Sequence, residues 1–215
     1  MHYITFLRHG ESEGNSEGVL QGQSDYALSQ TGIDQAQSMA HSWKSQGVVF
    51  DLIISSPLLR ASQTAEIIAS TIQVPLEFDP DWKERYMGQL QGANLHVLDE
   101  QRPPVDFFQP YEPIGGDGES QLDLYTRACR AIQKIIRQPA GSYLVVSHGG
   151  ILNKAVFVIL GITPQGHYNS PIIHFDNTGY AQFRYNSVSR QWAVMSLNNH
   201  VIDNYTEGQF SWKTD

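Results

Sequence analysis

Three short apolar segments of this 215-residue chain each run directly into polar residues and then into a helical pattern. The segments are Tyr3 to Leu7, Asp51 to Ile54 and Tyr143 to Ser147. Apolar runs of this length are typical of buried strands, and strands that alternate with helices form largely parallel sheets covered on both faces. Ligands of open α/β sheets bind at the carboxyl ends of the strands, so the residues that follow these runs are candidates for a site.

The intervening segments predict the helices and the late strands. Thr31 with Asp34 resembles a capping box, and Ser56 before Pro57 resembles the N-cap of a second helix. The predicted helices are Thr31 to Lys44, Ser56 to Ile68, Glu119 to Arg137 and an apolar helix from Gly150 to Leu160. The late strands are predicted at Ile172 to Phe175, Tyr180 to Tyr185 and Gln191 to Leu197, the last two as a hairpin.

Two further regions complete the expected fold. The inner face of the helix from Glu119 is expected at Leu122, Tyr125, Cys129, Ile132 and Ile136. Residues 75–118 are rich in Pro, Gly and aromatic residues, so we expect a long insertion lying over the active site. Residues 198–215 give no clear prediction. With no repeat or linker visible, residues 1–215 are expected to form one domain, a three-layer α/β/α sandwich with a mostly parallel central sheet.

Composition limits the kinds of partner. The formal net charge is −8, which disfavours sequence-independent nucleic-acid binding because such binding needs Lys and Arg on the surface. The single cysteine excludes an intramolecular disulfide and a Cys-based metal site. No signal peptide and no membrane-spanning run is found, so we expect a cytoplasmic protein with no membrane partner. The sequence does not give the oligomeric state, and a homodimer stays open.

The chemistry-bearing residues follow the predicted strands. Arg8 and His9 pair a planar, permanently charged phosphate donor with an imidazole nucleophile, although a surface Arg-His pair would look the same. Arg60 lies near a predicted helix N-terminus, where an anion would be favoured, and an exposed salt bridge is the plain alternative. His148 follows a hydrophobic strand and suits a phosphate oxygen or a satisfied core position. Glu84 is one of several candidates for the acid and base of ester cleavage.

Several motif-based alternatives fail. The chain has no His-Glu-x-x-His, and His9-Gly10-Glu11 lacks the Cys-x-x-Cys of the zinc deaminases. The glycine-spaced loop at Gly10, Gly14, Gly18 and Gly22 is not followed by Gly-Lys-Ser/Thr, which excludes a P-loop.

In combination these segments resemble the histidine phosphatase superfamily, the phosphoglycerate-mutase-like proteins. The match keeps the family's order through Arg8-His9-Gly10-Glu11, Asn15, Gln21-Gly22, Leu28-Ser29 with Gly32, Ser55-Ser56-Pro57 with Arg60 and Gln63-Thr64-Ala65, Glu84 with Gly88 and Gly92, Gly118-Glu119-Ser120, and Ser147-His148-Gly149. Each motif alone is weak, whereas the ordered set is specific and covers most of the chain.

The resemblance implies a covalent phosphohistidine mechanism without cofactor or metal. His9 would attack phosphorus, and Arg8, Arg60 and His148 would bind the equatorial oxygens. Glu84 would protonate the leaving group and then activate water. The further residues expected at the substrate are Asn15, Gln21, Gly22, Arg85, Gly149 and His200.

The resemblance leaves the acceptor of the phosphoryl group between water and a second hydroxyl. The stretch from Glu84 to Gly92 resembles cofactor-dependent phosphoglycerate mutases, but residues 93–113 contain only Arg102 where those enzymes have paired arginines. We therefore favour a phosphomonoester hydrolase acting on a small phosphorylated metabolite, with the mutase as the alternative.

The substrate is less constrained by the resemblance. Leu197-Asn198-Asn199-His200 resembles a segment of metal-independent phosphoserine phosphatases, so phosphoserine joins sugar phosphates, phosphoglycerates and α-ribazole phosphate as candidates. A catalytically silent binding module is the remote alternative, disfavoured because all five catalytic positions are intact.

Overall fold

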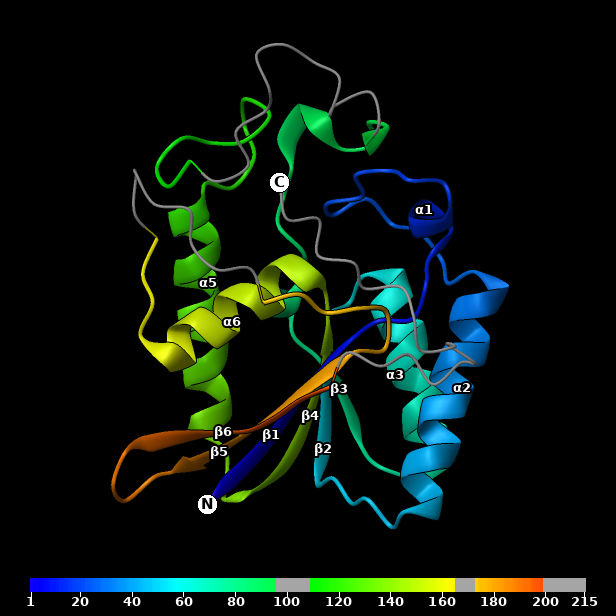
Figure 1. Cartoon of the computed structure of the whole chain (residues 1–215), viewed down its shortest axis with the longest axis vertical. Helices are drawn as coiled ribbons and strands as arrows, with labels where there is room; N and C mark the ends of the chain where they lie inside the picture. Colours follow the sequence, from blue (N-terminus) through cyan, green and yellow to red (C-terminus); the bar gives the residue numbers. More distant parts are fainter. Residues whose placement is uncertain (96–108, 165–172, 199–215) are drawn as a thin grey trace, which may run out of the picture.

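One six-stranded sheet, with helices on both of its faces, organises the chain (Figure 1). The computed structural model describes residues 1–95, 109–164 and 173–198. The strands are β1 (His2–Arg8), β2 (Leu52–Ser55), β3 (Leu76–Phe78), β4 (Gly141–Ser147), β5 (Tyr180–Asn186) and β6 (Gln191–Asn198). The helices are α1 (Glu13–Ser16), α2 (Gln30–Ser45), α3 (Leu59–Ile72), α5 (Gln121–Ile136) and α6 (Gly149–Leu160), with 3-10 turns η1 (Pro80–Trp82) and η2 (Gly88–Leu90).

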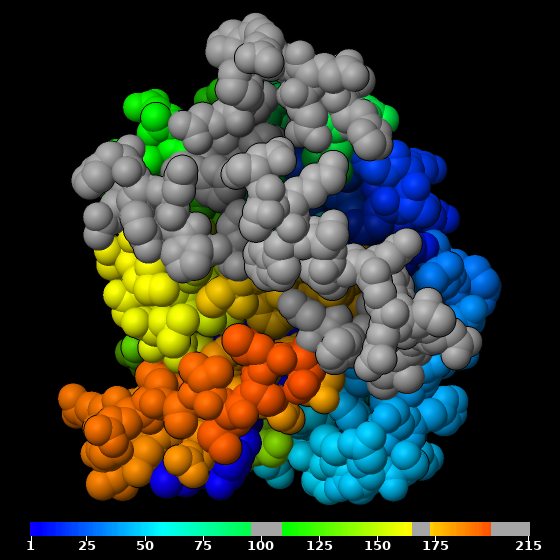
Figure 2. Space-filling view, viewed as in Figure 1, coloured from blue at the N-terminus to red at the C-terminus, as the bar shows by residue number. Residues whose placement is uncertain are grey.

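The sheet is mostly parallel, as the sequence predicts. Its order is β3-β2-β4-β1-β5-β6, and the first four strands in that order run parallel. β5 and β6 are antiparallel and form the predicted hairpin across Asn186 to Arg190. β6 is the edge strand of the sheet and lies at the molecular surface (Figure 2). Its side chains Val194, Met195 and Leu197 are exposed.

Two hydrophobic cores flank the sheet and complete the predicted three-layer sandwich. One lies between the sheet and the pair α2 and α3, with Leu7, Trp43 and Ile68 among its members. The other lies between the sheet and the pair α5 and α6, and contains Phe6 and Trp82. Because helices cover both faces of the central strands, the loops that follow these strands gather at the strand ends.

The start of α2 differs from the predicted capping box. The N-cap is Ser29, whose side chain accepts a hydrogen bond from Gly32 N at 3.1 Å. Asp34 instead accepts from the Gln30 side chain at 3.0 Å. The prediction at Thr31 was wrong because Ser29 is an equally good cap two residues earlier.

The start of α3 also differs from prediction. The N-cap is Leu58, without a side-chain cap, so Ser56 is not the cap and Pro57 precedes the helix. Ser56 Oγ accepts from Leu58 N and lies 2.8 Å from His148 Nε2. Asp25 Oδ1 instead accepts from Leu59 N at 2.6 Å. A cap supplied from 34 residues away leaves no local sequence signal.

The inner face of α5 is rotated from the predicted one. Leu122 is 41% exposed, and Tyr125 and Cys129 are only partly buried. The buried positions are Gln121, Leu124, Arg127, Ala128, Ala131, Ile132 and Ile135. The prediction is confirmed at Ile132, and Ile136 packs against the core. It was wrong at Leu122, Tyr125 and Cys129, because alanines contribute little to a hydrophobic pattern and because one buried position carries an arginine.

The remaining predictions concern the irregular segments. Residues 173–175 form no strand, and Phe175 O accepts a hydrogen bond from Arg8 Nη1 instead of joining the sheet. The predicted insertion, residues 75–118, contains the strand β3, which the sequence analysis did not predict. Its other described parts, residues 79–95 and 109–118, lie over the carboxyl ends of the strands (Figure 1). Arg102, Ile172 and the tail from Asn199 fall outside the described residues. Among the described helices, none has the length and apolar character needed to cross a membrane.

The rotated face of α5 gives a stability test. Ile135→Ala should lower the free energy of unfolding by about 2–5 kcal/mol, because Ile135 is 1% exposed in the core beneath the sheet. Leu122→Ala on the same helix should change it by only about 0.5 kcal/mol. Urea denaturation of both variants measures the difference, and equal losses would contradict the observed face.

Candidate active site

The ladder between β1, β4 and β2 brings three predicted site segments together. Arg8 is opposite Ser147 in the parallel register, and His9 N donates to Ser147 O at 2.9 Å. On the other side of β4, Ser56 N donates to Val146 O at 3.0 Å. The residues that follow the three strands therefore meet at one edge of the sheet, as predicted.

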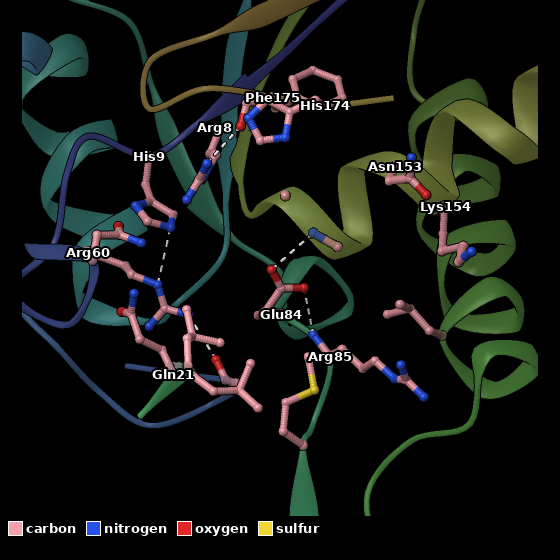
Figure 3. A pocket seen from close by; sticks show the side chains of 18 of the residues that line it. Arg8, His9, Gln21, Arg60, Glu84, Arg85, Asn153, Lys154, His174 and Phe175 are labelled. Carbon is pink, nitrogen blue, oxygen red and sulfur yellow. Dashed lines mark hydrogen bonds between the residues drawn. The ribbon is translucent and has the colours of Figure 1, made fainter. Parts of the chain in front are cut away.

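A cavity of about 390 Å³ opens at this edge (Figure 3). That volume suits a small-molecule ligand. Its polar lining residues are Arg8, His9, Asn15, Gln21, Arg60, Glu84, Arg85, Gln121, Asn153, Lys154 and His174. Glycines 22, 149 and 150 contribute backbone, and the apolar part comes from Val19, Leu20, Met87, Leu95, Leu124, Ile173 and Phe175.

His9 is held with one ring nitrogen unprotonated. Its Nδ1 lies 2.6 Å from Gly10 O. A carbonyl oxygen only accepts, so Nδ1 carries the proton and Nε2 keeps its lone pair. Arg60 Nε donates to Nε2 at 3.2 Å, which is consistent with this tautomer. The ring therefore presents a nucleophilic nitrogen beside a guanidinium.

The surroundings of His9 oppose its protonation. The side chain is 3% exposed, and burial lowers the pKa of His9 well below 6.5, helped by the charges of Arg60 and Arg8. Burial likewise lowers the pKa of His148, with Arg60 as the next cause. Both rings are thus neutral at neutral pH, and their centroids lie 5.1 Å apart.

Arg60 is fixed by three hydrogen bonds. Besides the bond to His9, Nη1 donates to Ser24 O at 2.9 Å and Nη2 to Gly22 O at 2.8 Å. Arg60 is 1% exposed, and burial lowers its pKa to about 10, so it is still charged at neutral pH. The loop containing Gly22 therefore holds this cation against His9.

Two buried side-chain nitrogens at the site have no hydrogen-bond partner among the described residues. Arg8 donates through Nη1 to Phe175 O at 2.7 Å, while its Nε has no acceptor there. His148 Nε2 lies 2.8 Å from Ser56 Oγ, and its Nδ1 is a donor when the serine hydroxyl donates to Nε2. A buried polar atom without a partner is costly, so both atoms are suited to a ligand that accepts hydrogen bonds.

Glu84 lies across the cavity at the N-terminus of α6. Gly150 N donates to one carboxylate oxygen at 3.0 Å, while Ile151 N at 3.2 Å and Arg85 N at 2.7 Å donate to the other. A Cβ on residue 150 would overlap the carboxylate, so a larger residue there would displace Glu84 from this position. The helix dipole and three amides hold this acid in a fixed place.

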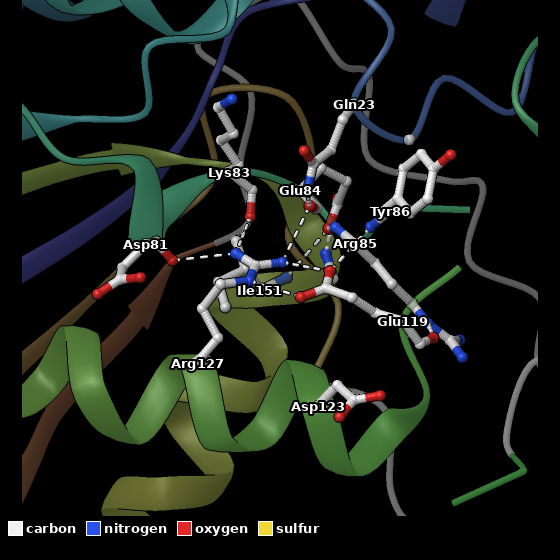
Figure 4. A network of polar contacts seen from close by, with 12 residues as sticks. Gln23, Asp81, Lys83, Glu84, Arg85, Tyr86, Glu119, Asp123, Arg127 and Ile151 are labelled. Carbon is white, nitrogen blue, oxygen red and sulfur yellow. Dashed lines mark hydrogen bonds and ion pairs between the residues drawn. The ribbon is translucent and has the colours of Figure 1, made fainter. Parts of the chain in front are cut away.

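Arg127 fastens the backbone around Glu84 (Figure 4). Its guanidinium donates to both Glu119 carboxylate oxygens, at 2.7 and 2.6 Å, and to the carbonyls of Asp81 and Lys83. It also donates to Glu84 O at 3.0 Å. A buried, fully bonded arginine of this kind fixes main chain rather than substrate.

The other predicted substrate residues have mixed surroundings. Asn15, Gln21, Gly22, Arg85 and Gly149 line the cavity. Asn15 Oδ1 accepts from Ser12 N at 3.1 Å and Gln21 Oε1 accepts from Ser12 Oγ at 2.9 Å, so the N-cap of α1 positions both side chains. Gly10 packs closely against the backbone of Gly32, so its missing side chain makes room for main chain and not for a ligand in the cavity. His200 falls outside the described residues.

Sequence comparison identifies the family. The family model of the histidine phosphatase superfamily, branch 1, matches residues 4–200. The chain belongs to the histidine phosphatase superfamily. The segments that resemble the family and the strand ends that meet in the structure are thus the same ones.

Similar proteins within the superfamily have different names. "Probable phosphoglycerate mutase GpmB" of Salmonella paratyphi A is 36% identical over 168 residues, covering 75% of this chain and 76% of that protein. A phosphoserine phosphatase from Entamoeba histolytica, solved with 3-phosphoglyceric acid, is 26% identical with a TM-score of 0.75 over 93% of this chain and 98% of the other. The fold is shared with a mycobacterial glucosyl-3-phosphoglycerate phosphatase, 22% identical with a TM-score of 0.77, over 93% of this chain and 100% of the other.

Sequence reasoning missed several residues of this superfamily site. Lys154 lines the cavity and is the one charged residue of α6, a signal that was available in an otherwise apolar run. Asn177 donates to His9 O at 3.0 Å, and its role was not recognised although it closely follows the strand predicted at Ile172 to Phe175. Arg127 gave no signal, because its partners are carbonyls distant in sequence. In the described part of the chain, no three His, Cys, Asp or Glu side chains gather as metal ligands would.

The neutral state of His9 can be measured directly. The imidazole should stay neutral as pH falls through 6.5, since a pKa lowered by burial and by two arginines keeps the unprotonated form at that pH. Titration by ¹⁵N NMR, with the signal assigned by its loss in His9→Gln, gives this pKa. A midpoint at or above 6.5 would contradict the electrostatic account.

Proposed function

We propose that the protein is a phosphomonoester hydrolase that acts on a small phosphorylated metabolite through a phosphohistidine intermediate. The observation that carries the proposal is the unprotonated Nε2 of His9, placed between Arg8 and Arg60 in a cavity with Glu84 across from it. This arrangement supplies a nucleophile, cations for the transferring group and a proton donor.

In the first step His9 Nε2 forms a bond to phosphorus as the bond to the ester oxygen breaks. Arg60 exchanges its hydrogen bond with Nε2 for one with a phosphate oxygen, while Arg8 Nε and His148 Nδ1 donate to the others. These donors are already in place, so they stabilise the transition state without reorganisation. Asn15 and the backbone at Gly149 complete the phosphate contacts.

Glu84 handles the protons. Its protonated form gives a proton to the leaving oxygen, and the resulting carboxylate then takes one from the water that attacks the phosphohistidine. The second step releases inorganic phosphate and restores both His9 and the protonated Glu84. Arg8, Arg60 and His148 supply the charge stabilisation, so neither metal nor cofactor is part of the proposal.

Water as the acceptor of the phosphoryl group is supported by residues 93–113. They contain one arginine, where the mutases have the pair that holds their substrate. The names of relatives support each side, since "Probable phosphoglycerate mutase GpmB" names a mutase and the Entamoeba protein is a phosphatase. Phosphoserine and 3-phosphoglycerate are therefore the first substrates to assay. The cytoplasmic location, a homodimer and the absence of nucleic-acid and membrane partners stay predictions.

Hydrolysis of p-nitrophenyl phosphate in EDTA tests the reaction class. We expect turnover that survives chelation and falls by roughly a thousandfold or more in His9→Ala, because the nucleophile is then missing. Turnover that requires added magnesium, or that persists in His9→Ala, would contradict the mechanism. Conversion of 3- to 2-phosphoglycerate without phosphate release would establish the mutase instead.

Arg127 tests the placement of the acid. Arg127→Lys should lower kcat for alkyl phosphates by about 10- to 100-fold, with little change in KM, because the loss of its forked bonds lets Glu84 shift. p-Nitrophenyl phosphate should be affected less, since nitrophenolate leaves without a proton.

The matched control for this variant is Arg130→Lys, one turn further along α5. Arg130 bonds the Asp81 carboxylate and makes no contact with Glu84. A purely structural role of Arg127 would lower kcat equally for both leaving groups, and that result would refute the positioning role.

A further inference from the structure

Lys154 is a buried cation in the cavity that the proposed chemistry does not use. It is the one charged residue of α6, and it is only 6% exposed although it lines the cavity wall. Lysine is rarely buried to this extent unless its charge is paired. The position therefore calls for a partner.

The described residues supply no anion for Lys154. None of their carboxylates forms a salt bridge with it. Its ammonium makes a cation–π contact with the Phe157 ring, with Nζ 4.6 Å from the ring centroid. Burial and the nearby charge of Arg85 lower the pKa of Lys154 to about 8. The ammonium thus stands near a second cation in a largely buried position, which an anionic ligand would stabilise.

The position of Lys154 defines what part of a ligand it would meet. Gly150 and Lys154 are four residues apart on α6, so they share a face and are separated by about 6 Å along the axis. Gly150 N binds Glu84, which lies at the leaving oxygen in the proposed reaction. In Figure 3, Glu84 lies between His9 with Arg60 on one side and Arg85 with Lys154 on the other. The alcohol part of an ester bound at His9 would extend toward Lys154.

The charges of the cavity point the same way. A phosphate dianion is balanced by Arg8 and Arg60. Among the described lining residues this leaves Lys154 as a further cation that no described carboxylate pairs. Arg85 Nε donates to Glu119 O at 2.8 Å, which holds that side chain at the wall. The positive charge of Lys154 lies where the alcohol would bind.

We propose that Lys154, with Arg85 beside it, binds a second negatively charged group on the alcohol part of the substrate. The inference rests on the proposed hydrolysis, which places the reacting phosphate at His9. The substrate class is then a phosphomonoester whose alcohol carries a carboxylate or another phosphate that reaches past Glu84 to Lys154.

Binding to the His9→Ala protein tests this without turnover. 3-Phosphoglycerate and glycerol 3-phosphate differ only by a carboxylate in place of a hydroxymethyl group, and fructose 1,6-bisphosphate and fructose 6-phosphate differ by one phosphate. Calorimetry should give an affinity about tenfold or more higher for the more anionic member of at least one pair, and that pair identifies the group. Equal affinities within both pairs would overturn the proposal.

Variants assign the effect to Lys154. In the same background, Lys154→Met should reduce the affinity ratio of the responsive pair by about tenfold, and Lys154→Arg should retain most of it. Lys44→Met, the same change on the exposed face of α2, should keep the full ratio. If Lys154→Met loses its helical circular dichroism, Lys154→Gln replaces it. An unchanged ratio in the neutral variant would overturn the role of Lys154.

The two proposals fail in different ways. If p-nitrophenyl phosphate is hydrolysed through His9 but the pairs bind equally, the anion subsite fails and the phosphatase stands. If no phosphate ester is cleaved while the more anionic ligands bind tighter through Lys154, the subsite stands and the hydrolysis fails.

Discussion

The register of the parallel ladder is the constraint on which the site depends. The hydrogen bond from His9 N to Ser147 O sets β1 against β4, and the bond from Ser56 N to Val146 O sets β2 against the same strand. A slip of one residue would turn every side chain of a strand to the other face, moving Leu7 and Phe6 each out of its own core and into the opposite one. The apolar cores on both sides therefore fix the positions of His9 and His148 to within the reach of a phosphate. The strand register that packs the two cores is therefore also the register that positions the catalytic side chains.

The neutral state of the nucleophile depends on burial, as in an ordinary core histidine, and in addition on buried positive charge. Burial alone would favour a neutral ring, and the guanidinium of Arg60 strengthens that preference while its Nε occupies the lone pair of His9 Nε2. Arg60 can be buried because Ser24 and Gly22 carbonyls take its remaining donors. The carbonyl oxygens of the loop after α1 thus take the place of water around the buried Arg60 guanidinium. Removing those carbonyls would displace the arginine rather than expose it.

The chain sequence determined much of this site and missed the rest for identifiable reasons. His9, His148 and Arg8 were predicted because each directly follows a buried strand, and the strand pattern is local. The caps of α2 and α3 were misassigned because Ser29 and Asp25 compete with better-looking neighbours, and Asp25 acts from another loop. The inner face of α5 was misjudged because Arg127 and two alanines occupy it. Asp25 and the carbonyl partners of Arg127 are distant in sequence, where periodicity carries no information, whereas Ser29 was a local alternative.

Helix α6 connects the chemistry to the choice of substrate. Its N-terminal amides at Gly150 and Ile151 hold Glu84, and one turn later it presents Lys154 to the same cavity. A rigid helix keeps the spacing between these two groups constant, so a ligand that satisfies both must carry its charges at matching positions. The apolar residues of the cavity wall contact a ligand through its shape and not through its charge. Discrimination between esters then depends on whether an anion replaces water at Lys154, since a buried cation left without a partner penalises the neutral alcohol.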